Sequence, residues 1–379
     1  MQMNDCAIII PVYNVGKQLQ RCLDSLVAQT VCPKYILLID DGSTDESSLI
    51  CDKYATNYSH IFAFHKANGG VSSARNMGLE IVTEHIYNNQ LISCTSKLYK
   101  SKYPPPMEVE LILFVDPDDW VDKSYVEKLT ENMSEADICI CGYQRVIYDN
   151  SFMWERMFSA PFFSNGENFT RQLVSLHKKT LLFMVWNKCF HSSIIYINHL
   201  RFPDVKRLED ACFVYQYLRH CHKINISKNE LYNYVLYGQN RKSATTSFGG
   251  ELCKGPFLLY KFAALLLDHC NELNNPTEDI ELFSKRVGHH LESSVWGELV
   301  NNLPISKLSF RERKKYIEEL LAKYYTIIEN SIKGQCNSFD SLTNFVRFLG
   351  RHKCFHTISA LSYLIPIGKK INRILHNNR

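Results

Sequence analysis

The stretch Phe114–Trp120, FVDPDDW, joins an apolar run to a cluster of acidic residues. The run Leu111–Val115 is wholly apolar, which is typical of a strand buried on both faces of a sheet. Asp116, Asp118 and Asp119 follow where that strand would leave the sheet. Carboxylates this close repel one another unless a cation lies between them or one of them takes up a proton. Oxygen ligands of this kind favour a hard divalent ion, Mg²⁺ or Mn²⁺, that also binds substrate phosphates. The alternative is an acidic turn that caps the following helix.

The same pattern of an apolar strand followed by acidic residues occurs earlier in the chain. Ala7–Val12 and Tyr35–Ile39 are predicted strands, and the second runs into DDGSTD at residues 40–45. Between these strands, apolar residues recur at helical spacing. We expect Ser43 or Thr44 to cap the helix after the second strand, with acidic residues in its first turn.

Ile61–Phe64 is predicted to be a third strand, and Gly70–Val82 another helix. Strands that alternate with helices predict right-handed crossovers and a mainly parallel sheet. Ligands of such sheets lie outside the carboxyl ends of the strands. The acidic residues at 40–41 and at 116–119 are therefore expected to converge on one edge, although they are far apart in the sequence.

Two common phosphate-binding motifs are missing from the sequence. Pro11-Val12-Tyr13-Asn14 follows the first strand in place of a Gly-rich dinucleotide fingerprint, and no GxxxxGK[ST] loop occurs. Asp41 would instead accept hydrogen bonds from a base or ribose, and Tyr13 would stack on a base. The glycines of NGGVSSARN, residues 68–76, stand at a predicted helix start, which either binds an anion or is only a turn. Arg75 would lie about one turn into that helix, within reach of a diphosphate.

Four motifs in this order resemble the nucleotide-sugar half of family 2 glycosyltransferases: IIIPVYN, LLIDDGSTDES, ANGGVSSARNMGL and LFVDPDDW. The resemblance covers residues 6–145 and continues more weakly through Trp186-Asn187-Lys188 and Leu208-Glu209-Asp210. It implies a GT-A fold, in which a Rossmann-like, mainly parallel sheet is flanked by helices. It also implies sugar transfer with inversion and dependence on a divalent cation, Mn²⁺ or Mg²⁺. The arrangement is similar to that of bacterial enzymes that build capsule, exopolysaccharide or O-antigen chains.

The resemblance also implies roles for individual residues. The nucleotide-sugar site would comprise Pro11, Tyr13, Asn14, Asp41, Gly70, Arg75, Asp116 and Asp118. Of these, Pro11, Tyr13 and Asp41 would hold the uridine, and Arg75 would lie near the diphosphate. Asp116 would lie near the ribose and the metal, and Asp118 would be a metal ligand.

By the same resemblance, Asp210 is the catalytic base. A sugar hydroxyl is a poor nucleophile until its proton is removed in the transition state, and a carboxylate can do this, with a contribution of roughly 10²–10⁴-fold. Glu209 and Asp210 also precede the apolar segment Ala211–Tyr215. The alternative is therefore that both acidic residues only favour the N-terminus of a helix.

One segment departs from the family pattern. Thr83–Glu110 lies between the Ala-Arg-Asn motif and the predicted metal-site strand, and it contains Pro104-Pro105-Pro106. Loops this long within compact domains are typically functional or disordered. The segment therefore either borders the donor or acceptor cleft or is a tolerated surface insertion.

The remainder of the chain predicts a helical region and a basic tail. Residues 1–250 are expected to form the catalytic domain, with 1–145 as the nucleotide-sugar half and 146–250 as the acceptor half. Residues 251–340 form the helical region, with helices at Phe257–Leu267, Leu282–Val300 and Arg311–Ile328. The 14 cysteines are scattered without a CxxC pair, and Met1–Ile10 is not a secretory signal, which favours reduced thiols in a cytoplasmic protein.

The tail, residues 341–379, is basic and amphipathic. It carries seven Lys or Arg and no acidic residue, and residues 355–365 are too short an apolar run to span a bilayer. A basic amphipathic helix at 355–379 would either lie on an anionic membrane, on the inner face of the cell membrane, or dock on the protein. No nucleic acid is expected as a partner, because no recognisable binding fold accompanies the charge.

The sequence thus predicts a peripheral, metal-dependent inverting glycosyltransferase that uses a UDP-sugar and a glycan or lipid-linked glycan acceptor. Two alternatives remain open at this point. One is a catalytically silent partner that binds nucleotide-sugar or glycan. The other is a nucleotidyltransferase, although the Gly-rich first loop of that class is missing.

Overall fold

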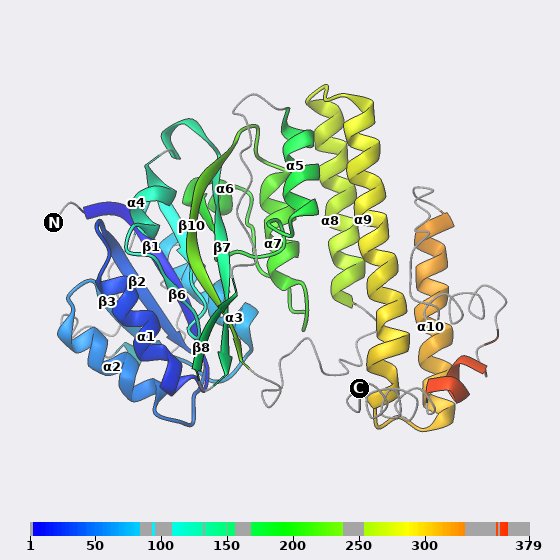
Figure 1. Cartoon of the computed structure of the whole chain (residues 1–379), viewed down its shortest axis with the longest axis horizontal. Coiled ribbons are helices and arrows are strands. Elements are labelled where there is room, and N and C mark those ends of the chain that lie inside the picture. Colours follow the sequence, from blue (N-terminus) through cyan, green and yellow to red (C-terminus); the bar gives the residue numbers. More distant parts are fainter. Residues whose placement is uncertain are drawn as a thin grey trace. The chain divides into compact units, whose positions relative to one another are not determined.

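The computed structural model of the chain describes residues 3–83, 93–94, 108–131, 133–149, 151–155, 168–237, 254–329, 354 and 357–362. The chain divides into two compact units (Figure 1). The first consists of Met1–Asp204 and Glu209–Arg241, and the second of Val205–Leu208 and Lys242–Arg379.

A single mixed sheet forms the centre of the first unit. Its strands are β1 (Met3–Val12), β2 (Cys32–Asp40), β3 (Ile61–His65), β4 (Ser93–Cys94), β5 (Leu111–Phe114), β6 (Trp120–Val121), β7 (Ile138–Asp149), β8 (Ser151–Glu155), β9 (Lys188–His191) and β10 (Ile224–Tyr237). They lie in the order β4-β3-β2-β1-β5-β9-β7-β10-β6, and β8 pairs with β7. The strands β3, β2, β1 and β5 are parallel, whereas β9 is antiparallel to both β5 and β7.

Helices flank this sheet, as the alternating pattern predicts (Figure 1). They are α1 (Gly16–Val27), α2 (Ser47–Asn57), α3 (Val71–Thr83), α4 (Tyr125–Thr130), α5 (Phe169–Lys178), α6 (Ser192–Ile197) and α7 (Glu209–Leu218), with a short 3-10 turn at Met133–Glu135. The predicted α/β fold, with helices that flank the sheet, is confirmed. The four parallel strands are joined in sequence by α1, α2 and α3.

The predicted cap of α2 is wrong. The helix begins at Ser47, and its N-cap residue is Glu46, whose side chain makes no capping hydrogen bond. The carboxylate of Asp45 instead accepts hydrogen bonds from the backbone N–H groups of Ser47, at 2.9 Å, and Gly16, at 3.1 Å. The acidic residues before α2 therefore tie the loop to the start of α1 rather than filling the first helical turn.

The core of the first unit is apolar and aromatic. Residues 6–10 of β1 are fully buried because this strand has neighbours on both sides and helices over the sheet. The rings of Phe202 and Phe213 stack with their centroids 4.2 Å apart, and Phe114 meets both rings edge-on. This cluster joins the end of β5 to α7, and so fixes the two elements that carry the acidic motifs.

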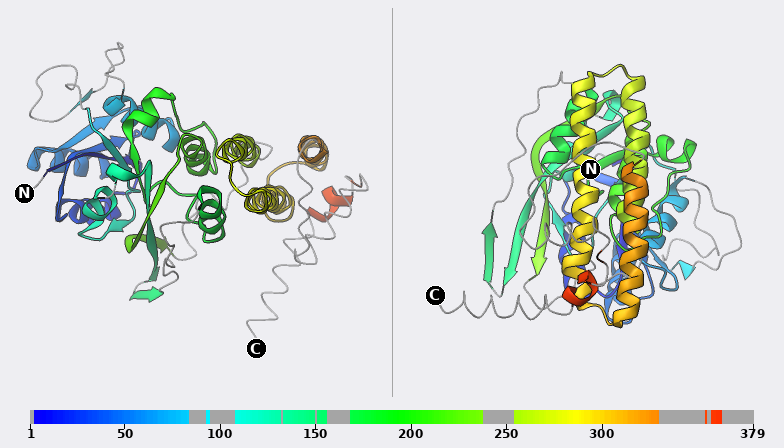
Figure 2. Two further views of the ribbon diagram at one scale, coloured as in Figure 1. Left: turned by 90° about the horizontal axis from the view of Figure 1, so that it is seen from above. Right: turned by 90° about the vertical axis from the view of Figure 1, so that its right-hand side faces the viewer.

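The second unit is helical. It contains α8 (Lys254–Glu272), α9 (Thr277–Gly297) and α10 (Phe310–Glu329), with a π-helical turn at Glu298–Asn302 and a 3-10 turn at Leu303–Ile305. Figure 2 shows these three helices nearly end-on in its left view, so their axes run in similar directions. α8 extends beyond both ends of the predicted Phe257–Leu267, whereas the predicted Leu282–Val300 becomes α9 followed by the π turn.

Part of the tail is packed within the second unit. Residues 357–362 form a helical turn in which Ile358, Ser359 and Ser362 are buried. The buried guanidinium of Arg313 donates to the Ser362 hydroxyl at 2.7 Å. The remainder of the predicted amphipathic tail and most of the segment 83–110, including its prolines, lie outside the described residues.

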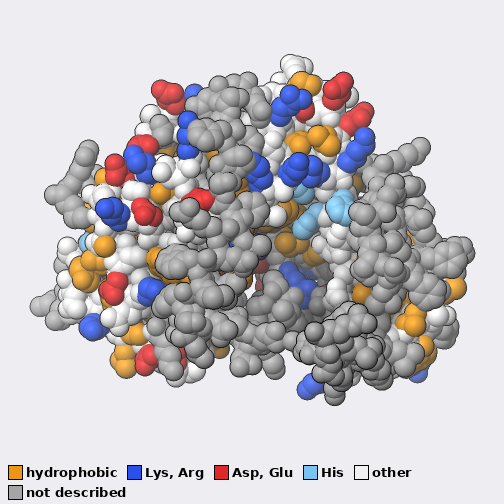
Figure 3. All heavy atoms as spheres, viewed as in Figure 1, with side chains coloured by type: hydrophobic (Ala, Val, Ile, Leu, Met, Phe, Trp, Pro, Cys, Tyr) orange, Lys and Arg blue, Asp and Glu red, His pale blue; other side chains and the backbone are white. Residues whose placement is uncertain are grey.

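Two further observations bear on the surface. No helix in the described part of the chain is both long and apolar enough to cross a membrane. On the face drawn in Figure 3, basic and acidic side chains are interspersed over the coloured residues.

Candidate active site

The carboxyl ends of three parallel strands place the predicted site residues on one edge of the sheet. Val12 of β1 pairs with Asp40 of β2, and Ile9 of β1 pairs with Phe114 of β5. Asp41 and Asp116 follow directly after these strand ends. The structure therefore brings the early and the late acidic motif to the same edge, as the strand–helix alternation predicts.

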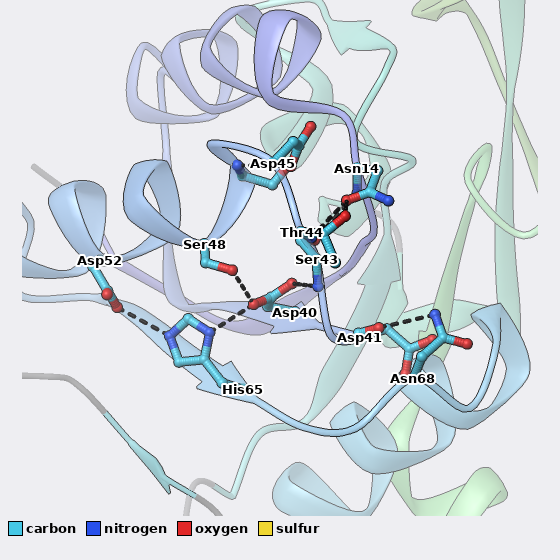
Figure 4. Close-up of polar contacts among 11 residues, drawn as sticks. Asn14, Asp40, Asp41, Ser43, Thr44, Asp45, Ser48, Asp52, His65 and Asn68 are labelled. Carbon is cyan, nitrogen blue, oxygen red and sulfur yellow. Dashed lines mark hydrogen bonds and ion pairs between the residues drawn. The ribbon is translucent and has the colours of Figure 1, made fainter.

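Asp41 is buried and holds the loop that precedes α3. Its carboxylate accepts hydrogen bonds from the ammonium of Lys66 at 2.5 Å and from the backbone N–H of Gly70 at 2.7 Å and of Gly69 at 3.0 Å. The side-chain amide of Asn68 donates to the Asp41 carbonyl at 3.0 Å (Figure 4). Gly70 has a φ of +86°, a conformation that glycine adopts readily. Asp41 thus shapes the Gly-Gly turn, in addition to any contact with a ligand.

The segment after β1 is joined to the loop after β2. Pro11 is buried, whereas Tyr13 is exposed on 49% of its surface. Asn14 has a φ of +51°, and its side-chain oxygen accepts a hydrogen bond from the backbone N–H of Thr44 at 2.8 Å (Figure 4). The backbone N–H of Asn14 donates to the Ser43 hydroxyl at 3.1 Å. Tyr13 is therefore an exposed ring on a segment that is held in place, as a base-stacking side chain requires.

A series of hydrogen bonds from Asp40 through His65 to Asp52, next to the loop after β2, was not predicted. His65 lies between Asp40, at 2.7 Å from Nδ1, and Asp52, at 3.0 Å from Nε2 (Figure 4). Although burial opposes ionisation, bonds from His65 and from the Ser43 and Ser48 groups hold the pKa of Asp40 well below its usual range. The bond to Asp40 also raises the pKa of His65. No local sequence pattern indicates these hydrogen bonds, because they join β2, α2 and β3.

The three aspartates of the FVDPDDW motif have different environments. Asp119 is buried, and its carboxylate accepts hydrogen bonds from the hydroxyl of Tyr232 at 2.8 Å and from the backbone N–H of Val235 at 2.7 Å. Burial raises the pKa of Asp119, and the charges of Asp118 and Asp116 raise it further. Asp119 therefore anchors the turn to β10, whereas Asp116 and Asp118 remain partly exposed.

Arg75 links Asp116 to the Glu209-Asp210 pair of α7 and is almost completely buried. Its Nη2 donates to Asp116 Oδ1 at 2.8 Å, its Nη1 donates to Asp210 Oδ1, and the same Nη1 lies 3.5 Å from Glu209 Oε1. Its Cζ lies 5.3 Å from the centre of the Phe202 ring. Burial opposes its charge, but the surrounding carboxylates raise its pKa further above the ordinary value. Arg75, predicted to lie near a diphosphate, thus forms ion pairs with Asp116, a predicted metal ligand, and with Asp210, the predicted base.

Asp210 lies in the first turn of α7, so the two sequence interpretations of Glu209-Asp210 are compatible. Burial raises the pKa of Asp210 to about 8, and the nearby Arg75 opposes this rise. The backbone N–H of Val185 also donates to this carboxylate. A carboxyl group whose pKa lies near neutral pH is suited to proton transfer, because it can both take up and release a proton there.

The described residues contain no group of three or more His, Cys, Asp or Glu side chains arranged to hold a metal ion. Asp116 and Asp118 nevertheless supply hard oxygen atoms that are partly exposed at the strand edge. Mg²⁺ in proteins commonly uses one or two carboxylates and takes its remaining ligands from water and substrate phosphates. These two residues therefore fit a divalent cation that binds together with a diphosphate.

Solved structures with this architecture include that of residues 1–349 of TarS from S. aureus in complex with UDP-GlcNAc. The match has a TM-score of 0.59 at 17% identity and covers 97% of this chain and 92% of that one. The complex of the same protein with UDP matches with a TM-score of 0.57. The fold is therefore the GT-A fold of glycosyltransferases.

Sequence comparisons agree with the fold. The model of the family described as Glycosyl transferase family 2 matches residues 7–87. The uncharacterized glycosyltransferase EpsJ of Bacillus subtilis is 29% identical over 63% of this chain and 62% of its own length. The uncharacterized glycosyltransferase YibD of Escherichia coli is 28% identical over 62% of each chain. The family match and these relatives support a family 2 glycosyltransferase, and the chain spans somewhat less than two thirds of the length of these relatives.

Proposed function

We propose that this chain transfers a sugar, with inversion, from a UDP-sugar to a glycan or lipid-linked glycan during bacterial surface-polysaccharide synthesis. The observation that carries the proposal is the shared contact of Arg75 with Asp116 and Asp210. Arg75 thus contacts both Asp116, the carboxylate that we propose for the cation, and Asp210, the partly buried carboxylate that we propose for the proton. The glycosyltransferase names of the relatives and the UDP complexes of TarS support the class of reaction and the uridine donor.

In the proposed reaction, the oxygen of an acceptor hydroxyl attacks the anomeric carbon while the bond from that carbon to the diphosphate oxygen breaks. Asp210 takes the hydroxyl proton, so its deprotonated form is the active one. A Mn²⁺ or Mg²⁺ ion held by Asp116 and Asp118 would stabilise the charge that develops on the leaving diphosphate. The positive charge of Arg75, which contacts Asp210, favours the ionised form of that carboxylate.

The donor site is proposed to use the exposed ring of Tyr13 against the uracil. Pro11 and Asn14 would support that ring from the same segment, and Asp41 and Gly70 would shape the turn beside it. Placement of the enzyme in the cytoplasm, peripheral on the inner face of the cell membrane, remains a prediction.

A UDP-release assay over a panel of UDP-sugars, with and without Mn²⁺, tests this function. Asp210→Asn keeps the shape of the side chain but removes its ability to accept the proton. We expect kcat to fall by roughly two or more orders of magnitude, while the Kd for UDP changes little. No UDP release by the unaltered protein with any donor, or loss of UDP affinity with retained turnover in Asp210→Asn, would contradict the proposal.

A further inference from the structure

The motif Trp186-Asn187-Lys188 closes a loop, residues 181–187, that lies between α5 and β9 in the first unit. The backbone N–H of Val185, in this loop, donates to the carboxylate of Asp210. Arg75 of α3 donates to the same carboxylate. Donors from two separate elements thus hold the candidate base, and one of them is a backbone group whose position depends on the loop.

A buried lysine binds this loop from within. Lys188 is the first residue of β9, and its side chain is completely buried. Its Nζ donates to the carbonyl oxygens of Leu181 at 2.6 Å and Met184 at 2.5 Å. It also donates to Asn187 Oδ1 at 2.7 Å. These three acceptors match the three N–H donors of an ammonium group, and all three belong to the loop 181–187.

The charge of Lys188 is unfavourable at this position by itself. Burial lowers the pKa of Lys188 to about 7. A buried charge costs free energy unless hydrogen bonds compensate it, whereas a buried apolar side chain carries no such cost. The next two residues of β9, Cys189 and Phe190, are buried as well. Hydrogen bonds to the loop, rather than filling of the core, therefore account for a lysine at this strand position.

A second set of contacts fixes the loop at Trp186 and does not involve Lys188. The indole of Trp186 stacks on the Tyr232 ring, with centroids 4.1 Å apart. The Tyr232 hydroxyl accepts a hydrogen bond from the backbone N–H of Asp116 at 3.1 Å. Trp186 is thus connected to the candidate cation site through Tyr232, whereas the neighbouring Val185 contacts the candidate base.

From these contacts we infer that Lys188 is a positioning residue, which braces the loop 181–187 and thereby holds the Val185 N–H against Asp210. The inference rests on the proposed function, in which Asp210 is the base. The bond from Val185 favours the ionised carboxylate that accepts the proton and, together with Arg75, fixes the direction of its oxygen atoms. A displacement of a catalytic group by about 1 Å can cost about 10²-fold in rate.

The test compares variants of the full chain. Lys188→Met keeps the length of the apolar stem and removes all three hydrogen bonds to the loop. Lys188→Gln keeps two N–H donors on a side chain that is one atom shorter, so part of the brace remains. Tyr217→Phe is the matched control, because Tyr217, in α7, binds β9 without the loop. Its hydroxyl accepts a hydrogen bond from the backbone N–H of His191 at 2.8 Å and donates to the Asp137 carbonyl at 2.7 Å.

We expect kcat for UDP release to fall about 10- to 100-fold in Lys188→Met and by a smaller factor in Lys188→Gln. The KM for the UDP-sugar should change less than about twofold, because Trp186 and Tyr232 keep their contacts on the donor side. Tyr217→Phe should lower the melting temperature but keep the kcat of the unaltered protein. Retained kcat in the Lys188 variants that fold, an equal loss in Tyr217→Phe, or failure of both Lys188 variants to fold would overturn the inference.

Hydrogen–deuterium exchange separates this inference from the proposed function. Exchange in a peptide spanning residues 181–187 should accelerate in Lys188→Met, and less so in Lys188→Gln, because the Val185 amide is no longer held against its partner. Tyr217→Phe should leave this exchange unchanged, and none of these results depends on a transfer reaction. Unchanged exchange in the Lys188 variants would refute the brace. An unaltered protein without transfer activity, whose Lys188 variants show faster exchange, would contradict only the proposed function.

Discussion

Replacement of Arg75 by Met removes the only cation that the structure pairs with both Asp116 and Asp210 among the described residues. The change keeps much of the apolar stem but leaves two carboxylates without a counter-charge. Hydrogen bonds that involve charged groups contribute about 1.5–3 kcal/mol each. Two such bonds give about 3–6 kcal/mol, which overlaps the cost of about 3–5 kcal/mol for removing one partner of a buried ion pair.

The loss should depend on pH, with a sign that follows from Asp210. Its pKa in the folded protein is raised to about 8 by burial, against the lowering effect of Arg75. Below that pH, Asp210 keeps its proton in both proteins, so its titration adds nothing to the deficit. As the pH rises through 8, the unaltered protein releases the proton beside Arg75, whereas the variant has no charge to compensate the carboxylate. The deficit should therefore grow by up to about 1.4 kcal/mol per pH unit above 8.

Urea denaturation at pH 6.5 and pH 9, followed by circular dichroism, measures the deficit. Hydrogen exchange in peptides of α3 and α7 assigns it to the first unit. Arg75→Lys keeps the charge and should show a smaller pH dependence. Lys34→Met is a matched control, because the Lys34–Asp5 pair at 2.7 Å is largely exposed and should contribute no more than about 1 kcal/mol. A deficit for Arg75→Met no larger than for Lys34→Met, or one that shrinks above pH 8, would refute the reasoning.

Three further outcomes are expected. Asp118→Asn should fold normally and lose most Mn²⁺-dependent UDP binding in calorimetry, and full metal-dependent binding would rule out its role as a ligand. Gly288→Ala should stabilise the protein by about 0.4–1 kcal/mol, because the added Cβ would meet no atom within 4 Å, whereas Gly255→Ala should destabilise it by about 1–3 kcal/mol, because the added Cβ would clash with the Arg207 carbonyl. Thermal unfolding should shift the melting temperature upward for the first variant and downward for the second, and shifts of the same sign would contradict this. The raised pKa of His65 means that its bond to Asp40 stabilises fully below the unfolded value of about 6.5 and is lost as the pH rises through the folded value, so His65→Asn should lower the melting temperature more at pH 6 than at pH 9, and equal losses would contradict this.

Local patterns in the sequence were sufficient for the parallel half of the sheet. The apolar runs that became β1, β2, β3 and β5 are buried on both faces, so their composition alone marks them as strands. The helices between them repeat apolar residues at helical spacing, and this alternation fixes the crossover direction. The convergence of Asp41 and Asp116 on one edge followed from that topology, without any knowledge of side-chain contacts.

Other features depended on contacts between distant segments. β9 lies between β5 and β7 and is antiparallel to both. No local pattern predicts this position, because the order of strands depends on pairing between segments that are distant in the sequence. Residue type alone likewise does not separate Asp118 from Asp119, which are adjacent and identical, and only the family resemblance assigned the metal to Asp118. The hydroxyl of Tyr232, from a strand far along the chain, makes Asp119 an anchor.

The sequence by itself determined the residue types that the proposed chemistry needs, because the carboxylates, the arginine and the Gly-Gly turn lie in short contiguous motifs that can be recognised without the fold. Only the tertiary structure decided which of these groups share a partner. Arg75, Asp116 and Asp210 come from three segments, and burial of one guanidinium group among their carboxylates required all three to pack together. The pKa of Asp210 follows from that packing, because desolvation and the distance to a charge are properties of the folded chain and not of the motif.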